Sequence, residues 1–176
     1  MKKIALASAG MAMVLVAGSV SAANSLNAGS FSLNVPIITT TPTGSVVQPV
    51  ANPLISGKYM IGKDMGVLGG FGFNSGGASG ATSTTIALMA GVRKYLKTDD
   101  FAPFVGGIFE YASTSGGGAS TNGLLLAAVA GAEYFMAKQF SVEGKVGFGY
   151  TSQDQAGVKT SYFGTGTANV SLNFYF

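Results

Sequence analysis

The feature that most constrains the fold is a repeat of strand-length segments joined by two kinds of connection. From residue 53 onward, each segment alternates in side-chain character and is rich in β-branched, aromatic and glycine residues, a pattern typical of β-strands. The segments cover residues 53–61, 66–73, 83–96, 103–113, 123–136, 141–150 and 160–176. An eighth segment, 30–38, alternates in the same way around Pro36, although a proline removes one donor from a strand ladder.

The connections between these segments alternate strictly in length. Residues 62–65, 97–102 and 137–140 are short and charged, whereas 39–52, 74–82, 114–122 and 151–159 are longer and rich in Gly, Ser and Thr. This alternation is typical of outer-membrane barrels, which have tight periplasmic turns and longer extracellular loops. The pattern therefore predicts an all-β fold, an eight-stranded antiparallel up-and-down transmembrane β-barrel, with periplasmic termini and extracellular long loops.

The first 22 residues have the three parts of a secretory signal peptide. Lys2 and Lys3 precede an apolar stretch over 4–16, and small residues follow at 20–22. Cleavage is expected after Ala22, or one residue later after Ala23. An amino-terminal membrane anchor is the alternative, but it needs about 20 apolar residues and this stretch is shorter. The predicted organisation is a cleaved signal peptide over 1–22 and one barrel domain over 23–176.

Charge, hydropathy and cysteine content argue against several other kinds of protein and site. Mean hydropathy is +0.40, yet after the signal the longest apolar run is nine residues, 124–132, too short for a membrane helix. Removing Lys2 and Lys3 leaves 8 of the 10 basic residues against 7 acidic ones, a net charge of +1. Nucleic-acid binding is therefore not expected. The chain has no cysteine, which excludes disulfides and thiolate metal sites.

The charged residues set the register of each strand. A lipid-facing Lys or Arg near mid-membrane costs about 2 to 4 kcal/mol, so the charges are placed inside. The opposite faces are then mainly apolar, as on 86–92 and 142–150, which favours a membrane barrel over a soluble sandwich. The predicted lumen charges balance three against three and suit an ion-pair network that fills a narrow barrel: Lys58, Arg93 and Lys145 with Glu110, Glu133 and Glu143. The alternative is a charged constriction in a conducting path.

Residues 123–136, GLLLAAVAGAEYFM, have a second interpretation. Their alanines and leucines also favour a buried helix, and periodicity alone does not separate the two. Two glycines and a position among alternating segments favour a strand.

The absence of histidine from the sequence argues against catalysis. A serine nucleophile lacks its usual proton acceptor, and the three lumen glutamates have nearby cations that keep them ionised. The acidic residues do not follow a calcium-loop spacing, and GFGFNSGG lacks the register of a phosphate-binding glycine loop. The prediction is a protein without enzyme activity, cofactor or bound metal.

The chain combines eight strand-length segments with the stretches APFVGGIFEY, AEYFMAKQFSVEGKVGFGY and the final NVSLNFYF. In these features it resembles the small outer-membrane β-barrel family, which includes the membrane domain of outer-membrane protein A. The resemblance covers the whole predicted mature chain and implies insertion by the barrel assembly machinery. That machinery recognises a last strand ending in an aromatic residue, and the matching residues here are Val170, Leu172, Phe174 and Phe176.

The functional prediction is an integral outer-membrane barrel with a structural or surface-interaction role and a packed, charge-balanced lumen. Outer-membrane lipid is its expected partner. The long connections carry few charges and suggest no particular surface ligand. The alternative is a narrow porin-like channel for small solutes or ions.

Overall fold

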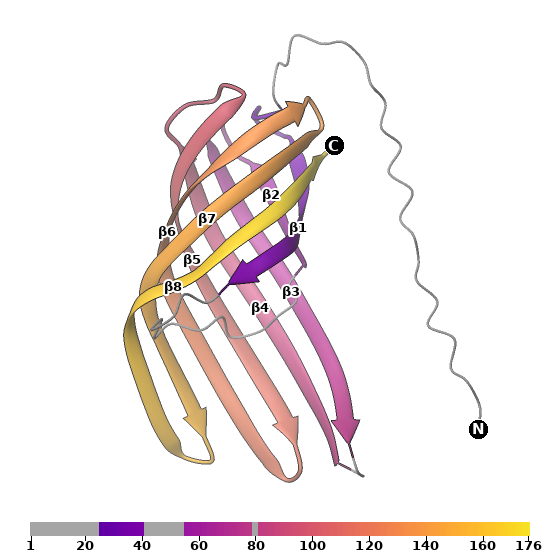
Figure 1. The fold of residues 1–176 in the computed structure, drawn as a ribbon, viewed down its shortest axis with the longest axis vertical. Coiled ribbons are helices and arrows are strands. Elements are labelled where there is room, and N and C mark those ends of the chain that lie inside the picture. The colour runs from indigo at the N-terminus through magenta and orange to yellow at the C-terminus, as the bar shows by residue number, and fades with distance from the viewer. Residues whose placement is uncertain (1–24, 41–54, 79–80) are drawn as a thin grey trace, which may run out of the picture.

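The computed structural model describes residues 25–40, 55–78 and 81–176, whose strands form a closed antiparallel barrel (Figure 1). Each strand pairs with the next along the chain, and the last pairs with the first to close the ring. The predicted all-β, eight-stranded fold is confirmed. The strands are β1 Phe31–Thr40, β2 Ile55–Met60, β3 Met65–Ala78, β4 Ala81–Tyr95, β5 Phe101–Gly116, β6 Ala119–Ala137, β7 Phe140–Gln155 and β8 Val158–Tyr175.

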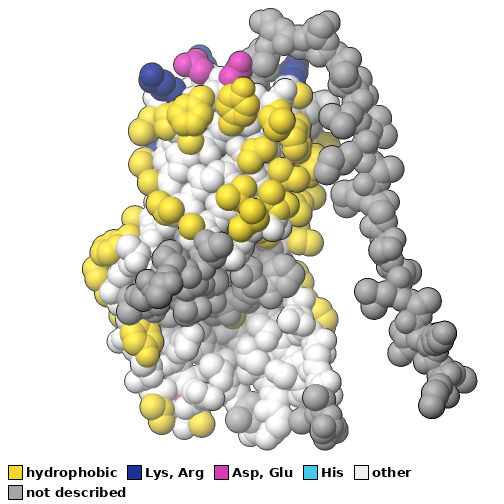
Figure 2. Space-filling model, viewed as in Figure 1, with side chains coloured by type: hydrophobic (Ala, Val, Ile, Leu, Met, Phe, Trp, Pro, Cys, Tyr) yellow, Lys and Arg dark blue, Asp and Glu magenta, His cyan; other side chains and the backbone are white. Residues whose placement is uncertain are grey.

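The two faces of each strand differ as the charge register predicts. On β4, the apolar Ile86, Leu88 and Val92 are exposed on the outside, while Met89 and Arg93 are buried inside. Figure 2 shows the exposed apolar side chains gathered over the half of the barrel nearer the short turns, with the charged side chains beyond them at that end. The other half is mainly polar and uncharged in this view. In the described part of the chain, no helix is long and apolar enough to cross a bilayer.

The longer connections after β3, β5 and β7 are mostly strand, which corrects the prediction of loops over 74–82, 114–122 and 151–159. β5 and β6 pair as far as Gly116 and Ala119, so only two glycines, with φ of 59° and 81°, form the turn. Ala156 and Gly157, also at positive φ, turn β7 into β8. Positive φ at both turn residues matches the twist of a two-residue hairpin, and Thr-rich flanks favour pairing. Most of the fourth predicted loop, 39–52, lies outside the described residues, as does the predicted signal peptide.

Three ladders shift register, and one of them, β6–β7, does so between Phe135 and Ala137. β1 forms as predicted, and its ladder with β8 shifts register between Pro36 and Ile38, where the proline supplies no N–H. The β7–β8 ladder shifts between Val146 and Phe148, where Gly147 lies opposite Gly166 and the next residue of β8. Figure 1 shows β7 and β8 bending strongly midway along the barrel, as a bulge causes.

Candidate functional site

Four charged side chains from four strands meet inside the barrel near the short turns. Lys58 of β2, Arg93 of β4, Glu133 of β6 and Glu143 of β7 each expose no more than 3% of their side-chain surface. Lys58 Nζ lies 2.8 Å from Glu133 Oε2, and Arg93 Nη1 lies 2.7 Å from Glu143 Oε2. Arg93 Nη1 also lies 3.7 Å from Glu133 Oε2, so the two pairs form one network of zero net charge.

Glu133 is the centre of this network. Its Oε2 accepts hydrogen bonds from Lys58 and from the Tyr95 hydroxyl, the latter at 2.5 Å. Its Oε1 accepts from the Ser141 hydroxyl at 2.5 Å and from the Tyr175 hydroxyl at 2.6 Å. Four donors therefore hold a carboxylate with no exposed surface, which is how a buried charge avoids being left unsatisfied.

The contacts of the Arg93 guanidinium fix its orientation as well as pairing its charge. Its Nη1 and Nη2 donate to the two oxygens of Glu143 at 2.7 and 2.8 Å, a bidentate arrangement that suits the planar guanidinium. The guanidinium carbon lies 3.8 Å from the ring centroid of Phe104. That ring fits above Gly131, where a Cβ would come within 2.7 Å of it. The glycine of β6 thus makes room for the ring that supports Arg93.

A series of hydrogen bonds between neutral polar side chains extends the network toward β1. Asn173 Nδ2 donates to Ser141 Oγ and Glu143 Oε2, both at 3.2 Å. Asn34 of β1 donates to Asn173 Oδ1 at 2.7 Å and to Ser171 Oγ at 2.8 Å. These inward groups cross the seam between β8 and β1, where the chain closes on itself.

An apolar cluster of buried side chains lies inside the barrel at the short-turn end. Leu26, from the segment 25–30 that precedes β1, is 1% exposed and belongs to it. Ser25 Oγ donates to the backbone oxygen of Lys138 in the β6–β7 turn, and Gly29 N donates to Met60 O. The segment therefore runs from β1 and β2 toward the β6–β7 turn. The other cluster members are Met60, Tyr95, Ala102, Phe104, Phe135 and Tyr175.

The remaining two predicted lumen charges are placed differently. Lys145 is 20% exposed and its Nζ lies 3.5 Å from Glu143 Oε1, at the edge of the network. Glu110 lies in another layer of the barrel, four residues along β5 from the Gly106 that pairs with Arg93. Its ladder neighbours are the buried Met89 and Leu125.

The sequence reasoning missed several partners of the network. Tyr95 shares the inward face of β4 with Arg93, so strand parity places it inside, but nothing in the sequence pairs it with Glu133. Ser141 likewise shares the inward face of β7 with Glu143. Leu26 precedes every predicted strand, so no periodicity pointed to it.

The geometry of these charges ties strands together across the lumen. The four central charges pair with one another and hydrogen-bond to hydroxyls and to Asn173, while Arg93 Nε has no partner among the described residues. Together the four side chains come from four of the eight strands. No described group of three or more His, Cys, Asp or Glu side chains is arranged to hold a metal ion.

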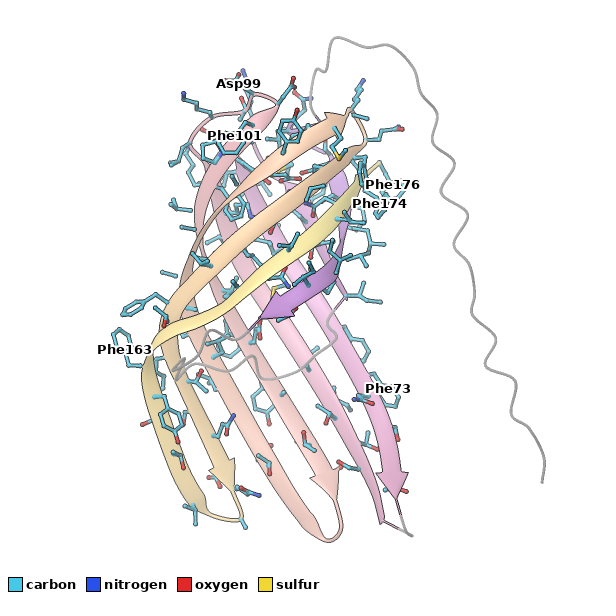
Figure 3. All side chains as sticks on the ribbon, viewed as in Figure 1. Phe73, Asp99, Phe101, Phe163, Phe174 and Phe176 are labelled. Carbon is cyan, nitrogen blue, oxygen red and sulfur yellow. The ribbon has the colours of Figure 1, made fainter. Side chains whose placement is uncertain are left out.

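The end of the chain lies at the seam of the barrel. Ser171, Asn173 and Tyr175 are buried inside, while the side chain of Phe176 is outside and stacks on Phe31 with ring centroids 6.5 Å apart. Figure 3 shows Phe174 and Phe176 together near the short-turn end, the end that also carries Asp99 and Phe101. The other predicted assembly residues, Val170 and Leu172, alternate with the inward residues of β8.

No protein-family model matches the chain, and no curated protein sequence matches it. Among solved structures, the N-terminal β-barrel domain of Pseudomonas aeruginosa OprF aligns with a TM-score of 0.50 at 13% identity, covering 85% of this chain and 98% of that one. The fold is that of the small eight-stranded outer-membrane barrels. Two further matches are weaker, each at 16% identity over 85% of this chain and 99% of the other. They are Ail, the attachment invasion locus protein of Yersinia pestis, with a TM-score of 0.41, and outer membrane protein W of E. coli, with 0.46.

Proposed function

We propose that the protein is an integral β-barrel of the bacterial outer membrane with a structural or surface-interaction role and no enzymatic activity. The observation that carries this proposal is the division of side chains between an apolar outer belt and a charge-balanced, buried lumen. Water cannot satisfy backbone groups within a bilayer, and a closed barrel satisfies them internally. The eight strands pair around the whole ring, which meets that requirement.

The height of the apolar belt supports the membrane location. Tyr134 of β6 and Tyr150 of β7 are both exposed, and Tyr150 pairs with Leu126, eight residues from Tyr134 along β6. At about 3.3 Å per residue this is roughly 26 Å along the strand, or about 18 to 21 Å across the membrane at a tilt of about 35 to 45°. Both tyrosines therefore fit within an apolar band about 25 Å tall, near its aromatic edges. Figure 3 places Phe101, Phe174 and Phe176 toward one edge and Phe73 and Phe163 toward the other.

The two ends of the barrel support an orientation. The short turns and the carboxy terminus lie at one end, which we propose is periplasmic (Figure 1). The neutral hairpins at the other end would then project outside the cell, where they form the surface for any interaction. This orientation also suits removal of a signal peptide over 1–22 and insertion by the barrel assembly machinery.

The packed lumen favours this role over the alternative of a narrow channel. Lys58, Arg93, Glu133 and Glu143 are almost fully buried, and the buried Leu26 lies in the apolar cluster at the same end. A conducting path needs a wetted surface that an ion can enter and leave. The charges of the network are instead paired with one another inside the barrel.

Single-channel recording in planar bilayers tests the closed lumen. The wild-type protein should give no stable conductance, and neither should Lys94→Gln, a change at an exposed neighbour of Arg93. A reproducible wild-type current that shifts in Arg93→Gln but not in Lys94→Gln would establish the channel instead. Resistance of the inserted barrel to protease measures membrane insertion separately from conductance.

A further inference from the structure

The outer surface of the barrel has an apolar hollow across β5 to β8. Its volume is about 600 Å³, within the range of about 300 to 1,000 Å³ typical of small-molecule sites. The hollow is lined across the strands by Val105 of β5, Ala130 of β6, Val146 of β7 and Ala168 of β8, which are consecutive ladder partners. Its lining is almost entirely apolar.

Small side chains and the β7–β8 bulge create the hollow. The outward positions of β6 carry Leu126, then Ala128 and Ala130, so the surface drops where the alanines begin. The bulge at Gly147, which also lines the hollow, bends β7 and β8 at the same level. Phe148 bounds the hollow on the side nearer the β7–β8 hairpin. Its ring packs edge-to-face against Phe163, with the ring centroids 4.8 Å apart.

The hollow opens to the outside and not to the lumen. On the inner face, methyl groups of Val129 lie 3.4 and 3.7 Å from the positions that a Cβ would take at Gly106 and Gly147. Val129 therefore fills the inner side of the sheet at this level. Ala130, Val146 and Phe148 are all exposed on the outer side.

The position of the hollow along the barrel is close to the middle of the apolar belt. Ala130 lies four residues from Tyr134 in one direction and four from Leu126, the ladder partner of Tyr150, in the other. Only hydrocarbon is present at that depth of a bilayer. Past Tyr134, β6 leads to Lys138 in the β6–β7 turn, an exposed cation at the membrane edge.

We infer that the hollow holds one acyl chain of a phospholipid from the leaflet at the short-turn end, with the lipid phosphate beside Lys138. This inference rests on the proposed membrane location and names a lipid partner for one face of the barrel. A recessed apolar floor increases the contact that a chain makes with protein, and the cation attracts an anionic headgroup. An acyl chain in the hollow lies against Ala128 and Ala130 and is bounded by Phe148.

Lipid retention tests the inference. The wild-type barrel is placed in nanodiscs of phosphatidylethanolamine and phosphatidylglycerol, released gently, and its mass measured with whatever lipid stays bound. We expect one retained phospholipid, mainly phosphatidylglycerol. The double variant Ala128→Leu/Ala130→Leu should lose it, because the added side chains fill the hollow. Ala90→Leu, on the outer face of β4 and away from the hollow, should keep it.

Further variants separate the parts of the site. Lys138→Gln should keep a bound lipid but lose the preference for phosphatidylglycerol. Ala168→Leu fills the hollow from β8 and serves if the double variant fails to assemble. Equal retention in the filled variants and the wild type, or a wild type that retains no lipid, would overturn the inference. So would a wild-type dimer that the filled variants abolish, because a second copy would then be the occupant. A wild-type chain that fails to enter nanodiscs would instead contradict the proposed membrane location.

Discussion

Arg93 of β4 and Glu143 of β7 form a two-point ion pair across the lumen, with N–O distances of 2.7 and 2.8 Å. The two strands are not neighbours in the ring, so the pair crosses the interior instead of following a ladder. Lys58 and Glu133 make a second such crossing between β2 and β6. Since each charge is buried, removing one partner leaves the other without compensation. The pairs therefore act as a unit in holding the strands together.

Replacing Glu133 by leucine should destabilise the barrel strongly. The change removes the acceptor for four buried donors and leaves the buried Lys58 ammonium without its carboxylate partner. We expect a loss of about 3 to 5 kcal/mol in the free energy of unfolding, the cost of breaking a buried pair. The urea midpoint of the refolded protein in detergent measures it. Asp64→Asn, at an exposed ion pair with Lys94, is the control and should change the midpoint only slightly. Equal midpoints for Glu133→Leu and wild type would mean that the network does not stabilise the fold.

Two glycines that are close in space should respond differently to alanine. At Gly131 a Cβ would press first on the backbone oxygen of Gly144 and then on the Phe104 ring at 2.7 Å, so Gly131→Ala should cost about 1 to 3 kcal/mol by overpacking. At Gly144, opposite Ala132 on the outer face, a Cβ would meet nothing within 4 Å. Gly144→Ala should be neutral or slightly stabilising, because alanine loses less backbone entropy than glycine. The urea midpoints of the two variants test this difference, and a Gly131→Ala midpoint equal to that of the wild type would show that the barrel accommodates a Cβ at Gly131.

Strand parity explains why the fold could be predicted from sequence. A charge such as Arg93 marks the inner face, and every second residue then follows, so Ile86 and Leu88 are correctly assigned to the outside. The hairpin ends could not be predicted in this way. Residues 114–122 have no apolar face, since they extend past the belt, and polar Ser, Thr and Gly residues look the same in a loop and in a solvated strand.

The candidate site was harder to predict than the fold. The alternation along a strand predicts whether a side chain points inward or outward, but not its position along the barrel axis. Glu133 and Glu143 lie close to the β6–β7 turn and pair with each other in the ladder, whereas Glu110 is nine residues from the start of β5. Counting residues from each turn would have separated Glu110 from the others. The contact between Glu133 and Tyr95 depends on the stagger of the whole ring, which no single hairpin reveals.

The Asp64–Lys94 pair at the β2–β3 end should make a small contribution that depends on pH. The hydrogen bond from Lys94, at 2.5 Å, holds the pKa of Asp64 below its ordinary value of 3.8. A lowered folded-state pKa stabilises the fold above the unfolded value, and this contribution is lost as the pH falls through the folded value. In Lys94→Gln the pKa of Asp64 should return toward its ordinary value, as NMR titration of the carboxyl carbon measures. An unchanged titration curve would show that Lys94 does not hold the pKa down.

Phe176 should matter for assembly more than its ring contact explains. Its side chain is 79% exposed and stacks only loosely on Phe31, while its backbone N–H donates to Phe31 O at 2.9 Å. Phe176→Ala and Phe31→Ala both remove the stacking and keep that backbone bond. If the last residue is the assembly signal, Phe176→Ala should reduce the outer-membrane fraction several-fold in cells, and Phe31→Ala should not. Both variants should refold equally well in detergent, where no assembly machinery acts. Equal losses in cells would instead assign the effect to closure of the β8–β1 seam, because the two variants share only the lost ring contact.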